Sequence, residues 1–97
     1  MDPTQVLAPR RRWTLDAVVY NEKEKQPGEG VAVALGLWDG RPVLAMRWNG
    51  TDSNPTGHPQ SRGFPTWFII PEKFRKSIQE NLSPESQARV QRFFAGP

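Results

Sequence analysis

Hydrophobic and polar residues alternate over residues 13–20, and apolar residues dominate residues 31–38 and 41–49. A period of two, with β-branched and aromatic residues at the apolar positions, is typical of a strand that buries one face. The dipeptide Asp39-Gly40 joins the last two segments, and tight hairpin turns favour such residues because they require positive φ. The pattern therefore predicts a strand over residues 13–20 and a β-hairpin over residues 31–49.

A two-residue turn also fixes which side chains share a face of this hairpin, because it places Leu35 opposite Leu44. One face is large and apolar, and we expect it to form the core: Val31, Val33, Leu35, Leu37, Pro42, Leu44, Met46 and Trp48. The other face has a centre of small residues: Ala32, Ala34, Gly36 and Ala45. Small side chains allow another surface to approach closely, and we expect a helix of this chain, in preference to a second copy, to cover them.

The C-terminal third predicts one more strand and two helices. Residues 66–70 are almost wholly apolar, which favours a strand buried on both faces at the centre of the sheet. Phe74, Ile78 and Leu82 recur every four residues, and Ser83-Pro84-Glu85 is a typical helix start. The predicted fold class is α+β, with a curled antiparallel sheet of three to five strands (a partial barrel) followed by two short C-terminal helices.

Length and composition indicate one domain. A chain of 97 residues is close to the common size for a single core. Residues 1–11 contain two prolines and no periodicity, so we expect a flexible basic tail there and a single α+β domain over residues 12–97. The N-terminus lacks the apolar segment of a signal peptide, and no apolar run approaches the roughly 20 residues of a membrane span. We therefore expect a cytoplasmic protein with no membrane segment.

The most informative segment for function is the loop over residues 50–65. It contains the single histidine of the chain and is rich in Gly and Pro. Loops of this length in compact domains are usually functional or disordered. We expect it and the adjacent sheet to contact a ligand or partner through these residues: Arg47, Trp48, Asp52, His58, Ser61, Arg62 and Trp67. The alternative is an ordered loop with no partner.

Catalysis and metal binding find less support. Asp52, His58 and Ser61 are the residue types of a hydrolytic triad, but such a triad depends on fixed geometry rather than on nearness in sequence. One histidine and no cysteine leave no typical metal-ligand set, and no phosphate-binding Gly motif occurs. We expect no metal and no cofactor, and an enzyme that uses His58 as base is the third hypothesis.

Nucleic-acid binding is the second hypothesis. The net charge is +3, and the densest basic cluster is Arg10, Arg11 and Arg12, followed directly by Trp13. Cations beside an exposed aromatic ring can bind single-stranded nucleic acid. The alternative is that Trp13 packs in the core and the arginines are solvated.

A resemblance supports the first hypothesis without adding chemistry. Its residues are the run 47–52, Gly57, Pro59, the run 61–63 and the run 66–71. This pattern resembles small bacterial proteins carried on mobile integron gene cassettes, over residues 13–75. The resemblance implies a cytosolic bacterial protein of a kind that is often oligomeric, and it brings no catalytic residues. We expect a non-enzymatic binding or assembly module that contacts a protein partner, including a second copy of itself, or a small ligand.

Overall fold

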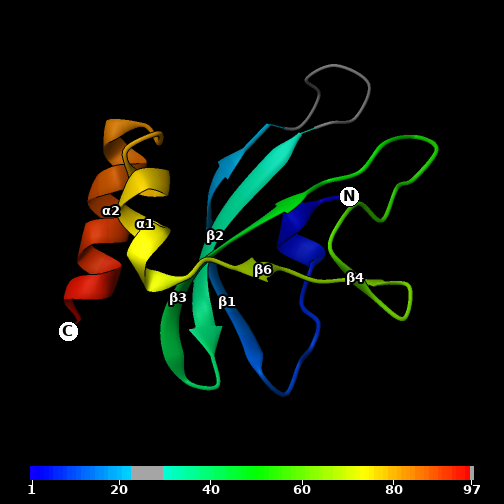
Figure 1. Ribbon diagram of the computed structural model, residues 1–97, viewed down its shortest axis with the longest axis horizontal. Coiled ribbons are helices and arrows are strands. Elements are labelled where there is room, and N and C mark those ends of the chain that lie inside the picture. The colour runs from blue at the N-terminus through cyan, green and yellow to red at the C-terminus, as the bar shows by residue number, and fades with distance from the viewer. Residues whose placement is uncertain (23–29, 97) are drawn as a thin grey trace.

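The computed structural model describes residues 1–22 and 30–96, and its centre is a four-stranded antiparallel sheet of order β1-β2-β3-β6 (Figure 1). The strands of this sheet are β1 (Trp13–Asn21), β2 (Val31–Trp38), β3 (Arg41–Trp48) and β6 (Phe68–Ile69). The other elements are η1 (Pro3–Gln5), the ribbon of β4 (Gln60–Ser61) and β5 (Phe64–Pro65), and the helices α1 (Glu72–Gln79) and α2 (Pro84–Ala95). The α+β class is therefore confirmed, with an open sheet rather than a closed barrel.

The hairpin of β2 and β3 forms as its sequence predicts. Asp39 and Gly40 have φ values of 51° and 81°, which is the left-handed backbone that a tight two-residue turn requires. Leu35 lies opposite Leu44, and Val33 lies opposite Met46. The alternation of side chains then gives the sheet two distinct faces.

The two C-terminal helices cover the large apolar face of this hairpin (Figure 1). Val33, Leu35 and Leu44 are buried there against Ile70, which follows β6, and against residues of the C-terminal helical region. They include Leu82, in the connection between α1 and α2, and Val90 of α2. Ser83 caps α2 by accepting from the backbone N–H of Ser86, as its position before Pro84 predicts. No helix within residues 1–22 and 30–96 is long and apolar enough to cross a membrane.

The small-residue face is covered differently from the prediction. Within residues 1–22 and 30–96, neither α1 nor α2 lies on it; instead, the rings of Trp13 and Trp67 and the side chain of Val6, which follows η1, pack there. The two rings lie 6.0 Å apart between centroids. The expectation of a covering helix is therefore wrong, because the space above Ala and Gly side chains is filled by large rings from neighbouring segments of this chain.

The N-terminal segment is part of the core that covers the small-residue face, whereas the sequence predicts a flexible tail over residues 1–11. Pro3 and Val6 are buried, and the indole N–H of Trp67 donates to the Val6 carbonyl at 2.8 Å. The amino group of Met1 donates to the Asn49 carbonyl at 2.9 Å. The boundary at residue 12 therefore does not separate a tail from the fold, because an apolar surface and backbone acceptors hold the segment.

Strand β6 lies at the edge of the sheet, not at its centre. It pairs with β3 through Ala45–Ile69 and Met46–Phe68 alone. The apolar run splits between environments: Trp67 and Ile70 are buried in different cores, while Phe68 is 56% exposed. The prediction of a central strand buried on both faces is therefore wrong, since a uniformly apolar run does not reveal which side chain remains uncovered.

Candidate functional site

A buried cation anchors the 50–65 loop. Arg47 on β3 is 2% exposed, and its guanidinium donates to the carbonyl oxygens of Thr66, at 2.6 Å, and of Thr56. Among the described residues no carboxylate pairs with it, and burial lowers the pKa of Arg47 to about 10. It therefore remains protonated at neutral pH, and its two terminal nitrogens donate to backbone carbonyls, while its buried Nε–H has no hydrogen-bond partner within the described residues.

The loop itself is closely hydrogen-bonded. The backbones of Trp48 and His58 exchange two hydrogen bonds, of 2.8 and 3.0 Å, which extend the end of β3. The His58 ring and the Asn54 amide are 3.0 Å apart, and Gln60 donates to the Gly57 carbonyl at 2.8 Å. The loop is therefore an ordered platform that holds His58 beside Trp48.

An apolar groove forms where this platform meets the sheet. Trp48 is 52% exposed and Phe68 is 56% exposed, and both lie on the helix-side face beyond the part that the helices cover. The groove has a volume of about 350 Å³ and these lining residues: Val31, Met46, Arg47, Trp48, His58, Pro59 and Phe68. The residues that line it include no carboxylate and no lysine, and the guanidinium of Arg47 is occupied by the loop. The groove is suited to apolar groups.

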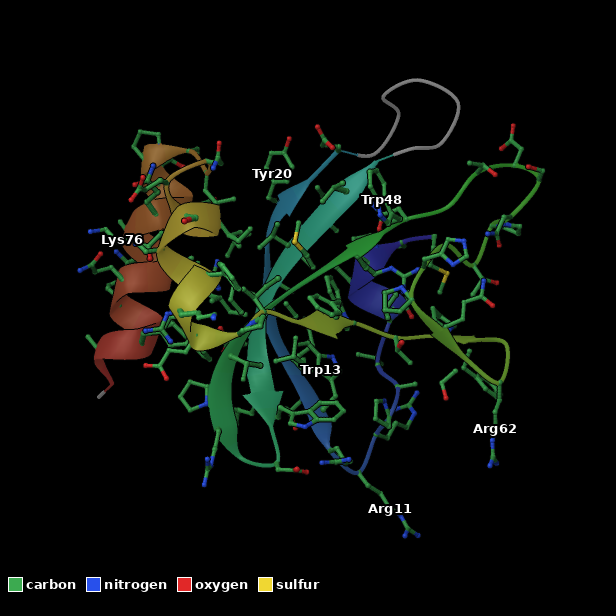
Figure 2. The ribbon with its side chains drawn as sticks, viewed as in Figure 1. Arg11, Trp13, Tyr20, Trp48, Arg62 and Lys76 are labelled. Carbon is green, nitrogen blue, oxygen red and sulfur yellow. The ribbon has the colours of Figure 1, made fainter. Side chains whose placement is uncertain are left out.

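Three of the expected contact residues lie away from this groove. Asp52, Ser61 and Arg62 are exposed on the loop, and Arg62 with Gly63 forms the tight turn between β4 and β5 at φ values of 53° and 82°. Figure 2 shows Arg62 extending outward from the molecule. A fourth expected residue, Trp67, is 6% exposed, because it packs in the core on the small-residue face with Val6 and Trp13. Of the expected set, the structure thus brings Arg47, Trp48 and His58 together.

The residue types of a triad do not converge. His58 contacts Asn54, and no hydrogen bond joins its ring to Asp52 or Ser61 within the described part of the chain. Triad chemistry requires the base to hydrogen-bond both the nucleophile and an orienting acid. The loop geometry therefore offers no support for His58 as a catalytic base. No group of three or more His, Cys, Asp or Glu side chains gathers into a metal-binding arrangement in residues 1–22 and 30–96.

The basic cluster before β1 is partly engaged in the fold. Arg12 donates to both carboxylate oxygens of Asp39, at 3.1 and 2.7 Å, and lies 4.6 Å from the ring centroid of Trp38. The hydrogen bond from Arg12 holds the pKa of Asp39 below its usual value. Trp13 is buried, and Arg10 and Arg11 are exposed and form no ion pair within the described residues (Figure 2 labels Arg11). Trp13 therefore offers no exposed face on which a base could stack, and the Trp38 ring beside the cluster already contacts Arg12.

Sequence reasoning missed Phe68 and Met46 as members of a surface. Both occupy apolar strand positions, and nothing local distinguishes them from core residues. The signal that could have found them is the length of the helices: α1 and α2 are too short to cover the whole sheet face.

Comparisons of the chain with family models, with curated proteins and with solved structures find no match.

Proposed function

We propose that this chain is a protein-binding module whose apolar groove, beside the 50–65 loop, receives apolar side chains of a partner polypeptide. The observation that carries the proposal is the exposure of Trp48 and Phe68 together on one sheet face. Scattered exposed apolar residues are ordinary, but two large rings that line one groove are typical of interaction surfaces. Tryptophan in particular is enriched among residues that dominate binding energy.

The chemistry of the groove supports an apolar partner over a charged one. Its walls are Val, Met, Trp, Phe and Pro side chains with the His58 ring at the border. A charged ligand would lose water there without gaining an opposite charge. The groove volume of about 350 Å³ accommodates one or two side chains, or a small apolar molecule.

The groove is also held rigid before binding. Arg47 ties two points of the loop to β3, and the Trp48–His58 bridge fixes the border of the groove. Ordering a surface on binding costs free energy, so a surface that is ordered in advance binds more tightly. These internal bonds support a docking platform rather than a catalytic centre.

The test uses Trp48→Ala and Phe68→Ala, with Phe64→Ala as the matched control. Phe64 is 67% exposed and does not line the groove. Sedimentation velocity measures self-association, and selection from a displayed peptide library measures binding of other polypeptides. We expect selected apolar peptides, or the dimer, to be lost in Trp48→Ala and Phe68→Ala and retained in Phe64→Ala. Equal loss in all three variants, or a monomer that selects no peptide, contradicts the proposal.

A further inference from the structure

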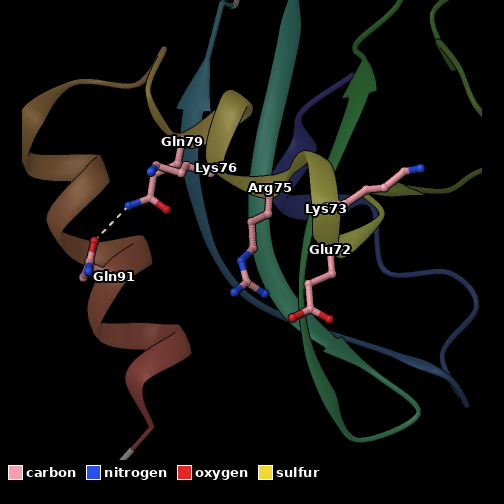
Figure 3. Close-up of a pocket in the computed structure, with 6 residues that line it drawn as sticks. All are labelled: Glu72, Lys73, Arg75, Lys76, Gln79 and Gln91. Atoms are coloured by element: carbon pink, nitrogen blue, oxygen red, sulfur yellow. Dashed lines mark hydrogen bonds between the residues drawn. The ribbon is translucent and has the colours of Figure 1, made fainter.

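A second cavity lies at the two C-terminal helices. Four side chains of α1 follow the spacing i, i+3, i+4, i+7 and therefore share one face: Glu72, Arg75, Lys76 and Gln79. With Lys73 and with Gln91 of α2, they line an open pocket of about 690 Å³, here called the basic pocket (Figure 3). None of these residues lines the apolar groove.

The pocket carries three cations without an ion-pair partner among the described residues. The lining contains the three cations Lys73, Arg75 and Lys76 and one carboxylate, that of Glu72. Within the described residues no carboxylate lies within ion-pair distance of these three cations. Neighbouring unpaired cations raise the local positive potential and attract anions.

Arg75 is positioned rather than free. Its guanidinium carbon lies 3.7 Å from the centroid of the Phe94 ring on α2. Stacking on an aromatic face restricts the guanidinium plane while its N–H groups stay available at the edges. No hydrogen bond joins these groups to any residue of 1–22 or 30–96.

The opposite wall is polar and fixed. Gln79 donates to the side chain of Gln91 at 3.1 Å, which joins α1 to α2 across the pocket (Figure 3). The Gln79 amide nitrogen already donates to Gln91 and to the Gln87 carbonyl, so the Gln91 amide nitrogen is the neutral donor that an anion can share with the cations. A forked guanidinium, a lysine and one amide donor around one space match the oxygen atoms of a phosphate group.

We propose that the basic pocket binds a small ligand that carries a phosphate group, with Arg75 as the bidentate donor and Lys76 as the second cation. A volume of about 690 Å³ suits a small molecule. Glu72 is the one unfavourable charge in the lining, so it weakens binding. The proposal is independent of the apolar groove and of its partner.

The test is a titration of the full chain with inorganic pyrophosphate, followed by amide chemical shifts. We expect the largest shifts in α1 and around residue 91. Arg75→Gln weakens binding about tenfold, and Lys76→Gln about threefold, because charge-assisted hydrogen bonds are lost. Arg75→Lys keeps the charge but loses the fork, and we expect an intermediate loss. Arg89→Gln is the matched control, since it removes one cation from α2 at a position outside the pocket.

For Glu72→Gln we expect the affinity for pyrophosphate to change in the opposite direction. It should tighten pyrophosphate binding about threefold, because a like charge beside the anion is removed. Glu85→Gln, which also removes one carboxylate but lies outside the pocket, should change it much less. Thermal unfolding of each variant separates lost binding from lost structure.

Three outcomes overturn the proposal. One is the absence of shifts in α1 with pyrophosphate. Another is equal weakening by Arg75→Gln and Arg89→Gln, which would indicate net charge alone. The third is a single-stranded oligonucleotide that binds this pocket far more tightly than pyrophosphate, which would assign the cations to a polynucleotide backbone instead of a small ligand.

Discussion

The guanidinium of Arg47 donates a 2.6 Å hydrogen bond to the carbonyl oxygen of Thr66, nineteen residues further along the chain. The same side chain also donates to the Thr56 carbonyl. One buried cation thus connects β3 to the middle and to the far end of the loop. Removing Arg47 would take a charged donor from two part-buried carbonyls, so we expect the loop anchor to stabilise the fold.

Arg47→Met should lower the free energy of unfolding by about 3 kcal/mol, because two part-buried carbonyls lose a charged donor. Arg62→Met is the control, since Arg62 is an exposed arginine of the same loop, and it should change stability by less than about 0.5 kcal/mol. Urea unfolding measures both. In Arg47→Met, amide hydrogen exchange should accelerate in residues 50–66 before it does in the rest of the sheet. Equal stability of the two variants would show that the anchor does not hold the loop.

Val6→Ala should destabilise the protein by about 2 kcal/mol, because the Val6 side chain is fully buried in the same core cluster as Trp67. The half-buried neighbour Leu7 lies outside this core cluster, so Leu7→Ala should cost less. Thermal or urea unfolding provides the measurement. If Val6→Ala unfolds like the wild type, residues 1–11 behave as a tail after all.

Gly36→Ala should destabilise the sheet by about 3 kcal/mol through overpacking. A Cβ at this position would overlap both the ring of Trp13 and the backbone carbonyl of Thr14. The near-ultraviolet circular dichroism of the tryptophans should change with it, because the Trp13 ring must move. An unchanged unfolding midpoint would mean that the ring has room that the packing does not show.

The Arg12–Asp39 pair predicts a defined pH response. The hydrogen bond from Arg12 lowers the pKa of Asp39, so the folded state holds this proton less tightly than the unfolded state. The stabilisation is complete above the unfolded pKa of about 4 and is lost as pH falls through the lower folded pKa. In Arg12→Gln the pKa of Asp39, followed by carboxyl ¹³C shifts, should rise toward its usual value. An unchanged pKa would show that the pair is not formed in solution.

The local elements of this protein were determined by its sequence. Asp39-Gly40 tolerates left-handed backbone, and the alternation on each side leaves one register, so the hairpin and its two faces follow from residue order. The cap at Ser83 and the apolar spacing of the last two segments likewise predict α2 and its buried face. Each of these results depends on interactions between residues a few positions apart.

Only the tertiary structure decided which segments of the chain cover each face of the sheet. Small side chains at Ala32 and Ala34 left a space that helix, ring or second chain could fill, and long-range contacts of Val6 and Trp67 filled it. The apolar run of residues 66–70 gave no indication that Phe68 would remain exposed, because exposure depends on where two short helices stop covering the sheet. The candidate groove exists because the two helices leave part of the sheet face uncovered. Which residues are buried there depends on contacts between segments far apart in the sequence, and no local sequence pattern predicts such contacts.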